Sequence, residues 1–130
     1  MINLKTSVRI ARPIDEVFAY VSDPTRFPAW NSAVRSVRET SPSTYAMERD
    51  LPTGRVHNDL EVVTRDPPAE FAIRTTSGPT PFFYRYRFSR EGAGTLLELD
   101  AEIRLPRIAA PAIKRGLEAN LATLVREFGG

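Results

Sequence analysis

Five short turn-forming segments divide residues 34–105 into six stretches of strand length. The segments are TSPS (40–43), LPTG (51–54), DPPA (66–69), SGPTP (77–81) and EGAG (91–94). Glycine, proline, aspartate and serine favour turns, and short apolar or β-branched stretches between regularly spaced turns are typical of antiparallel strands. The spacing therefore predicts a six-stranded meander in which each strand pairs with the next one along the chain.

Charge and hydrophobicity predict the pairing register within this meander. If EGAG is the loop of the last hairpin, opposite charges face each other on one side and apolar residues on the other: Arg85–Asp100, Arg87–Glu98, Tyr86–Leu99 and Phe88–Leu97. The same test predicts Glu61–Arg74 and Val62–Ile73 in the hairpin with loop DPPA, and Glu48–His57 and Met47–Asn58 in the hairpin with loop LPTG. A slip by one residue would invert both faces. We therefore expect one charged, solvated face and one apolar face.

The segment before the meander predicts a strand and two short helices. Residues 2–11 alternate between apolar and polar side chains, as a half-buried strand does. Pro13 suits the first turn of a helix, whose apolar face comprises Ile14, Val17, Phe18 and Val21. Asp23-Pro24 ends that helix. Residues 24–30 are expected to form only a short second helix, because Pro28 interrupts it.

The C-terminal segment changes to the helical period. Its apolar stripe comprises Ile113, Leu117, Leu121, Leu124, Val125 and Phe128. Pro111 is expected to mark the first turn or a bend near the start of this helix. A long helix with one apolar face is the natural cover for the apolar face of the sheet.

Composition narrows the class of protein. The 130 residues suit one domain over residues 1–130, with a net charge of +2 and basic residues spread among acidic ones, which argues against nucleic-acid binding. There is no cysteine and only one histidine, so we expect no disulfide, metal or other cofactor. No apolar run approaches the ~20 residues of a membrane span, and the N-terminus lacks the apolar core of a signal peptide. We expect a cytoplasmic bacterial protein without stable membrane insertion, either a monomer or a homodimer.

One segment resembles a known superfamily. Residues 11–37, ARPIDEVFAYVSDPTRFPAWNSAVRSV, match its opening pattern xxVFxxhxDxxxxPxW at Pro13, Val17, Phe18, Asp23, Pro28 and Trp30. DPPAEFAI (66–73) is similar to its proline turn before the fifth strand. The chain thus resembles the START-like or SRPBCC superfamily, which includes Bet v 1-type proteins, polyketide cyclases and lipid-transfer domains.

The resemblance covers essentially the whole chain and implies a fold. That fold is the α+β helix-grip fold, with a seven-stranded antiparallel sheet curved around a long C-terminal helix and two short helices between strands one and two. It implies no single activity, because the superfamily contains binders, transporters, cyclases and protein-interaction modules.

Polar residues on the predicted apolar face are candidates for a binding site. By the register above, this face carries Arg49, Asn58, Thr75, Tyr84 and Tyr86. Small side chains at Thr75 and Ala101 are expected to leave space beside the tyrosines. Burying an unpaired polar group costs about 1–3 kcal/mol, so these groups need a partner.

The terminal helix and the second short helix complete the predicted cavity. Asn120 lies beside the stripe that contains Leu117, Leu121 and Leu124, and Trp30 is expected at the floor. Each candidate also has a purely structural interpretation. Trp30 can be a packing wedge, the tyrosines core aromatics with hydroxyls at the rim, Arg49 can extend into solvent, and the two asparagines can bind backbone.

Three functions remain open at this point. The favoured one is binding or transport of a hydrophobic small molecule or lipid in a cavity between sheet and helix. The second is a polyketide cyclase or aromatase-like enzyme that acts by positioning its substrate. The third is a protein-interaction module with a filled core. The sequence shows no nucleophile–base pair, no carboxylate pair on the inner face and no phosphate-binding glycine loop, so catalysis is left open and no catalytic residue is predicted.

Overall fold

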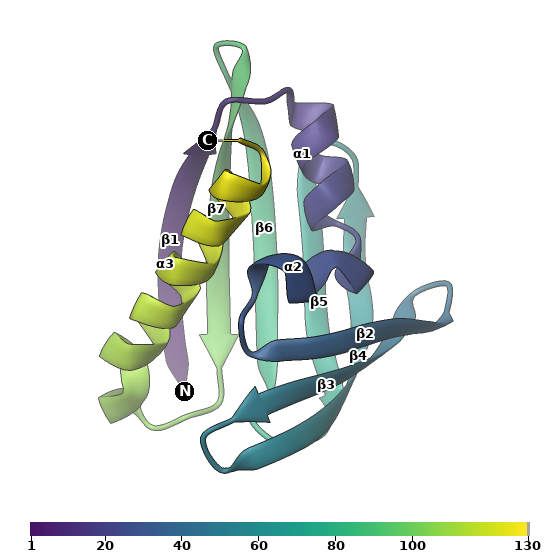
Figure 1. Cartoon of the computed structure of the whole chain (residues 1–130), viewed down its shortest axis with the longest axis vertical. Helices are drawn as coiled ribbons and strands as arrows, with labels where there is room; N and C mark the ends of the chain where they lie inside the picture. The colour runs from purple at the N-terminus through teal and green to yellow at the C-terminus, as the bar shows by residue number, and fades with distance from the viewer. Residues whose placement is uncertain (130) are drawn as a thin grey trace.

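The computed structural model describes residues 1–129 and contains one seven-stranded antiparallel sheet (Figure 1). The strand order is β1-β7-β6-β5-β4-β3-β2, so the predicted meander is confirmed and the first strand is added at its far edge. The strands are β1 (Ile2–Ile10), β2 (Val34–Ser41), β3 (Thr44–Leu51), β4 (Gly54–Asp66), β5 (Glu70–Ser77), β6 (Phe82–Glu91) and β7 (Gly94–Ile103).

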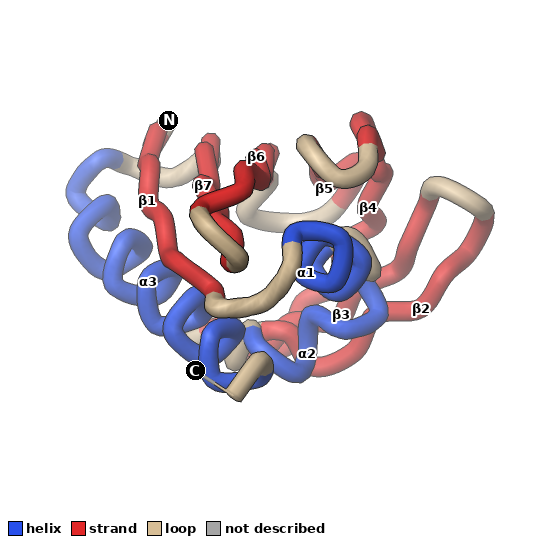
Figure 2. Tube along the Cα trace, turned by 90° about the horizontal axis from the view of Figure 1, so that it is seen from above, coloured by secondary structure: helices blue, strands red, loops and turns tan. Residues whose placement is uncertain are grey.

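All helices lie on one side of the curved sheet (Figure 2). They are α1 (Ile14–Val21), the 3₁₀ helix η1 (Pro24–Arg26), α2 (Phe27–Trp30), the 3₁₀ helix η2 (Arg107–Ala109) and α3 (Ala110–Glu127). The long helix α3 runs beside β1, while α1 and α2 lie between it and the other end of the sheet. This is the expected α+β helix-grip arrangement. None of the described helices is long and apolar enough to cross a membrane.

The two short helices differ in one detail from the sequence prediction. Pro28 does not interrupt a helix but lies in the first turn of α2, where a missing N–H breaks no helical hydrogen bond. Pro24 starts η1 in the same way, and the carboxylate of Asp23 accepts a hydrogen bond from the backbone N–H of Thr25 at 3.1 Å. The proline-rich segment therefore forms two successive single turns that end at Trp30.

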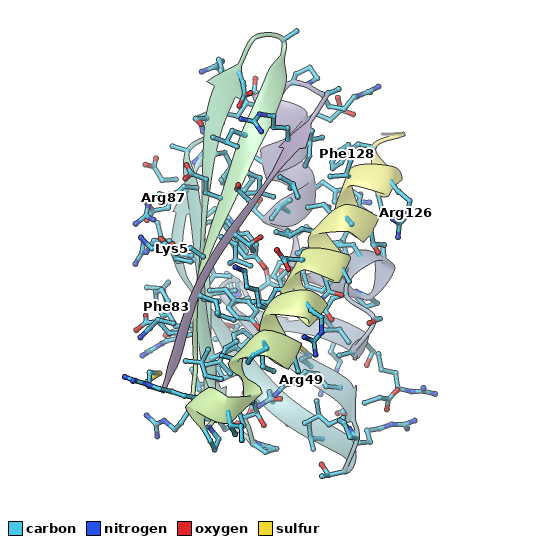
Figure 3. All side chains as sticks on the ribbon, turned by 90° about the vertical axis from the view of Figure 1, so that its left-hand side faces the viewer. Lys5, Arg49, Phe83, Arg87, Arg126 and Phe128 are labelled. Atoms are coloured by element: carbon cyan, nitrogen blue, oxygen red, sulfur yellow. The ribbon has the colours of Figure 1, made fainter. Side chains whose placement is uncertain are left out.

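The predicted strand register is confirmed at every pair tested. Arg85 is opposite Asp100 and Arg87 is opposite Glu98, with Phe88 opposite Leu97 on the other face. The ion pairs themselves are partly diagonal, since Arg87 pairs with Asp100 rather than with the residue directly opposite. A long arginine side chain reaches a diagonal neighbour readily in a twisted sheet. Figure 3 shows Arg87, Lys5 and Phe83 on the outer face, directed away from α3.

The apolar core joins the inner face of the sheet to the helices. The predicted α1 face is buried, and Phe18 packs edge-on against Phe88 with ring centroids 5.0 Å apart. On α3, Leu117, Leu121 and Leu124 are buried, while the outer members of the predicted stripe are half-buried. The buried side chains of α1 and α3 thus meet the same sheet face and fix both helices on it.

We expect truncation of two core residues to destabilise the fold strongly. Phe18→Ala and Leu121→Ala should each lower the free energy of unfolding by about 2–5 kcal/mol, because both remove a buried side chain and leave a cavity. Chemical denaturation with a circular dichroism readout measures this. Ile108→Ala is the matched control, because Ile108 is 91% exposed and its loss should change little. Midpoints equal to wild type for the two core variants would contradict the assigned packing.

On the outer face of the sheet, the neighbours of His57 raise its pKa. His57 lies opposite Glu48, and its two ring nitrogens are each 2.8 Å from a carboxylate oxygen, one of Glu48 and one of Asp59. Both nitrogens donate only when the ring is protonated. The hydrogen bonds to Glu48 and then to Asp59 therefore raise the pKa of His57 above its ordinary value of 6.5.

Titration of His57 by NMR should give a pKa above 6.5 that falls in Glu48→Gln. Because the folded-state pKa is raised, the stabilisation is complete below the unfolded-state value and is lost as pH rises through the folded value. The free energy of unfolding should therefore decrease slightly over that window, slightly because the ring is about half exposed. A pKa at or below 6.5 would show that these hydrogen bonds do not form in solution.

Candidate ligand-binding site

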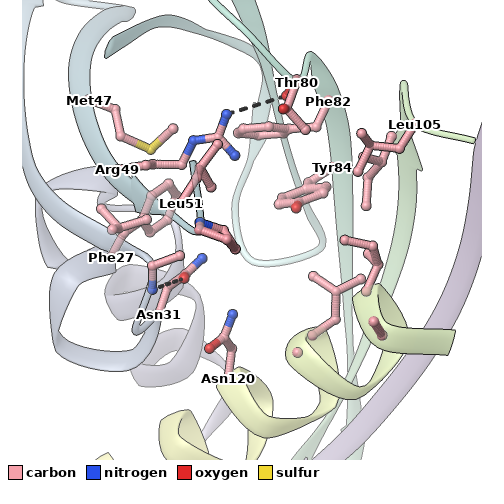
Figure 4. A pocket seen from close by; sticks show the side chains of 18 of the residues that line it. Phe27, Asn31, Met47, Arg49, Leu51, Thr80, Phe82, Tyr84, Leu105 and Asn120 are labelled. Carbon is pink, nitrogen blue, oxygen red and sulfur yellow. Dashed lines mark hydrogen bonds between the residues drawn. The ribbon is translucent and has the colours of Figure 1, made fainter. Parts of the chain in front are cut away.

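A pocket of about 380 Å³ lies between the inner face of the sheet and the N-terminal half of α3 (Figure 4). Apolar side chains make most of its wall, among them Phe27, Met47, Leu51, Phe82, Ile103, Leu105, Ile113 and Leu117. Its lining also includes the exposed residues Pro52, Ala112 and Gly116, so the pocket reaches the surface between the β3–β4 turn and α3. The lining contains no aspartate or glutamate.

Aromatic rings form one continuous wall of this pocket. Alternate side chains of a strand share a face, so Phe82, Tyr84 and Tyr86 of β6 all point inward. The rings of Phe82 and Tyr84 stack with centroids 4.2 Å apart, and Tyr86 meets Tyr84 edge-on at 6.4 Å. Trp30 of α2 continues the row, with its ring 6.3 Å from that of Tyr86.

The two tyrosine hydroxyls are hydrogen-bond donors at neutral pH. Burial raises the pKa of Tyr84 to about 12, although the nearby positive charge of Arg49 acts in the opposite direction. Burial also raises the pKa of Tyr86, and the neighbouring Tyr84 adds to that increase. Within residues 1–129, neither hydroxyl has a protein partner, and both residues line the pocket. Each hydroxyl is therefore free to bind a polar group inside it.

Trp30 both packs in the core and lines the pocket. Its side chain is 3% exposed, and its ring meets Phe27 edge-on at 5.6 Å. Its indole Nε1 is the one buried side-chain nitrogen or oxygen of residues 1–129 that lacks a hydrogen-bond partner. Trp30 thus packs in the core, as one of the two interpretations expected, and it also lines the pocket, while its indole N–H is unpaired.

Arg49 is buried at the other end of the aromatic wall, so the alternative that it extends into solvent is wrong. Its Nε donates to Oδ1 of Asn58 at 3.0 Å, and its Nη2 donates to the carbonyl oxygens of Pro79 at 2.9 Å and Thr80 at 3.4 Å. The guanidinium carbon lies 5.6 Å from the ring centroid of Phe82. Burial lowers the pKa of Arg49, but an arginine remains protonated in proteins.

Asn58 supports Arg49 rather than lining the pocket. The Asn58 side chain is fully buried, and its Nδ2 donates to the carbonyl oxygens of Ser77 and Pro79 at 3.1 and 2.9 Å. The alternative in which this asparagine binds backbone is therefore confirmed. Gly78 makes the arrangement possible: it has φ +96°, and a Cβ there would lie 2.2 Å from the carbonyl oxygen of His57. Only glycine lets the 77–81 turn approach this closely.

Asn120 closes the pocket from the helix side. It lies on α3, lines the pocket, and its Oδ1 accepts a hydrogen bond from the backbone N–H of Ser32 at 3.4 Å. This bond ties α3 to the segment that follows α2. The alternative that Asn120 binds backbone is therefore also confirmed, and it does not remove the residue from the pocket.

The pocket brings together six of the residues predicted from sequence and not the other five. The six are Trp30, Arg49, Tyr84, Tyr86, Leu117 and Asn120. Of the rest, Asn58 is described above, and Leu121 and Leu124 are buried in the core beyond the pocket.

The space expected beside Thr75 and Ala101 is not part of the pocket. Ala101 is buried directly opposite Tyr84 in the β6–β7 pair. The hydroxyl of Thr75 accepts a hydrogen bond from the backbone N–H of Phe82 at 3.1 Å, where the β5–β6 pairing has ended. The opening lies instead on the α3 side.

Sequence reasoning missed the helix and turn residues that line the opening. Ala112 and Gly116 lie eight and four positions before Asn120 and one position before the stripe residues Ile113 and Leu117, so helical periodicity places them on the face of Asn120, beside the apolar stripe. A Cβ built at Gly116 meets no atom within 4 Å. The signal available in the sequence was Gly116 itself, because a glycine in the middle of a predicted helix is not needed for the backbone conformation. Across residues 1–129, no three histidine, aspartate or glutamate side chains group as metal ligands would.

Solved structures share this architecture at low sequence identity. DR_A0006 from Deinococcus radiodurans aligns with a TM-score of 0.81 at 18% identity, over 97% of this chain and 96% of that chain. A START superfamily protein from Mycobacterium smegmatis aligns at 0.77 and 19%, over 98% and 94%. Ara h 8.0201 aligns at 0.76 and 8%, over 98% and 97%. At these identities the likeness shows the fold alone.

The sequence comparison is more specific. No curated protein matches the chain significantly. A family model does, and it covers residues 1–129. This match confirms the resemblance of the opening motif, and the START and Ara h 8 structures confirm the fold. The chain belongs to the family described as polyketide cyclase / dehydrase and lipid transport.

Proposed function

We propose that this protein binds a small, largely apolar molecule in the pocket between β6 and α3. The observation that carries the proposal is the unpartnered donor of Trp30, a residue of a mostly apolar pocket wall. An empty apolar pocket forgoes dispersion contacts, and an unpartnered buried donor is costly. One guest with an apolar body and an acceptor group would resolve both.

The volume of the pocket suits this function. About 380 Å³ lies within the usual range of small-molecule sites, which are mostly apolar with a few placed polar groups. It argues against the interaction module with a filled core. A binding or transport role is also the simpler choice because the lining has hydrogen-bond donors but no carboxylate, histidine or cysteine to act as base or nucleophile.

A cyclase-like activity is the second candidate, and one observation favours it. Tyr84 is held protonated, with a pKa raised to about 12, close to the positive charge of Arg49. Such a pair can polarise a substrate carbonyl. Turnover of a supplied poly-β-ketone, measured against Tyr84→Phe, separates this activity from binding alone.

We expect Gly116→Leu to block binding without harming the fold. The leucine would extend from a helix position where a Cβ meets nothing within 4 Å, into the opening of the pocket. The probe is N-phenyl-1-naphthylamine, a neutral apolar fluorophore, and Trp30 is the only tryptophan, so its emission reports binding independently. Wild type should show saturable binding with quenching of the Trp30 emission. Gly116→Leu should bind the probe at least about tenfold more weakly, which corresponds to a loss of ~1.4 kcal/mol in binding free energy.

Ala119→Leu is the matched control, because Ala119 is an exposed residue of the same helix outside the pocket lining. It should bind like wild type. Absence of saturable binding by wild type, or equal weakening in both variants, would contradict the proposed site.

Gly116→Ala should stabilise the protein. Glycine in a helix interior costs about 0.5–1 kcal/mol relative to alanine, and nothing in the structure requires glycine at this position. Denaturant unfolding should show a gain of that size, whereas Gly78→Ala should show a clear loss because its Cβ would clash with backbone. A loss of stability in Gly116→Ala would point to a packing role for the glycine.

A further inference from the structure

We infer that the pocket selects amphipathic molecules with one anionic head group, such as a carboxylate, and that Arg49 is the residue that binds this head. The inference rests on the proposed function, since it takes the pocket to be a binding site and specifies its ligand. It follows from the charge balance of the pocket, from the partners of Arg49, and from the groups beside it.

The pocket lining carries one positive charge and no negative charge. Arg49 is the only charged side chain in the lining, and it is the only buried charged residue among those the structure describes. Eight other arginines in residues 1–129 pair with carboxylates on the surface. Arg49 has no carboxylate within ion-pair distance in that part of the chain. A buried cation without a counter-ion is unfavourable, so the pocket favours an anion.

The protein contacts of Arg49 orient its guanidinium but leave part of it unused. Its Nε and Nη2 donate to three neutral oxygens, those of Asn58, Pro79 and Thr80. A guanidinium has five N–H donors, and within residues 1–129 those on Nη1 have no hydrogen-bond partner. The 77–81 turn and Asn58 thus hold the group in place, while its charge stays available to a ligand. Oriented guanidinium groups bind carboxylates strongly.

The surroundings of Arg49 define the rest of the ligand. Tyr84 is close enough for the Arg49 charge to act on its pKa, and its protonated hydroxyl is a second donor for the same head group. Away from Arg49 the wall is aromatic and aliphatic as far as Trp30 and Leu117. A molecule with a carboxylate at Arg49 and an apolar chain or ring system along this wall matches both regions. Figure 4 shows Arg49 beside Phe82, across the pocket from Asn120 of α3.

Three ligands with the same chain test the inference. Decanoate, 1-decanol and decylamine are used, below their aggregation concentrations, to displace N-phenyl-1-naphthylamine from wild-type protein. Decanoate should displace the probe at a concentration at least about tenfold lower than the alcohol or the amine, because a charged hydrogen bond adds roughly that factor. The preference should persist at high salt, since a buried pair is weakly screened.

Arg49→Gln tests the residue itself. It should remove the preference for decanoate while 1-decanol binds as before, and Arg49→Lys, which keeps the charge, should retain part of it. Arg38→Gln is the matched control, because Arg38 is an exposed arginine of β2 outside the pocket lining. Melting curves by circular dichroism show whether each variant is folded. The wild-type comparison of the three ligands decides the inference even if Arg49 variants do not fold.

Each outcome separates the inference from the proposed function. Equal displacement by decanoate and 1-decanol, or a preference for decylamine, would overturn the anionic head group and leave the binding pocket in place. A decanoate preference that survives Arg49→Gln in a folded variant would overturn the role of Arg49. Failure of the probe to bind wild type at all would overturn the proposed function itself.

Discussion

The two-residue period of β6 determines which of its side chains line the pocket. Because successive side chains point to opposite faces, Phe82, Tyr84 and Tyr86 enter the interior while Arg85 and Arg87 lie on the outer face. The register against β7 fixes this choice, since a one-residue shift would bury both arginines. The register of β6 against β7 thus determines both the aromatic wall of the pocket and the charged outer surface.

The polar groups of the interior divide into those the protein satisfies and those it does not. Both polar atoms of the Asn58 carboxamide are paired: Nδ2 donates to the backbone of the 77–81 turn, and Oδ1 accepts from Arg49. Trp30 Nε1 has no such partner. The satisfied group lies behind the pocket, and the unsatisfied donor belongs to a residue of its wall. This distribution is the one that the proposed binding function requires, with a rigid support behind the pocket and a donor left unpaired.

The fold was predictable because its local signals agree with one another, whereas the site depended on contacts distant in sequence. Turn spacing and charge pairing predicted the strands and their register. Periodicity also predicted that Arg49 lies on the inner face. Its burial, however, depends on the 77–81 turn, whose carbonyl oxygens accept hydrogen bonds from the guanidinium. Space was expected at Ala101 from its small size. The actual opening depends on how α3 crosses the sheet, which brings Gly116 rather than Ala101 to it.

The strand order also has a consequence for the way the chain assembles. Ile2 pairs with Ile103, so the edge strand that begins the chain has its partner in the last strand to be made. The six strands from β2 to β7 each pair with a neighbour in sequence and can form by successive hairpins. During synthesis on the ribosome, β1 cannot form its native pairing until β7 has emerged, and the helix α3 that lies against β1 follows later still. Closure of the sheet by β1 and covering of the pocket by α3 therefore require that β7 and α3 have been made.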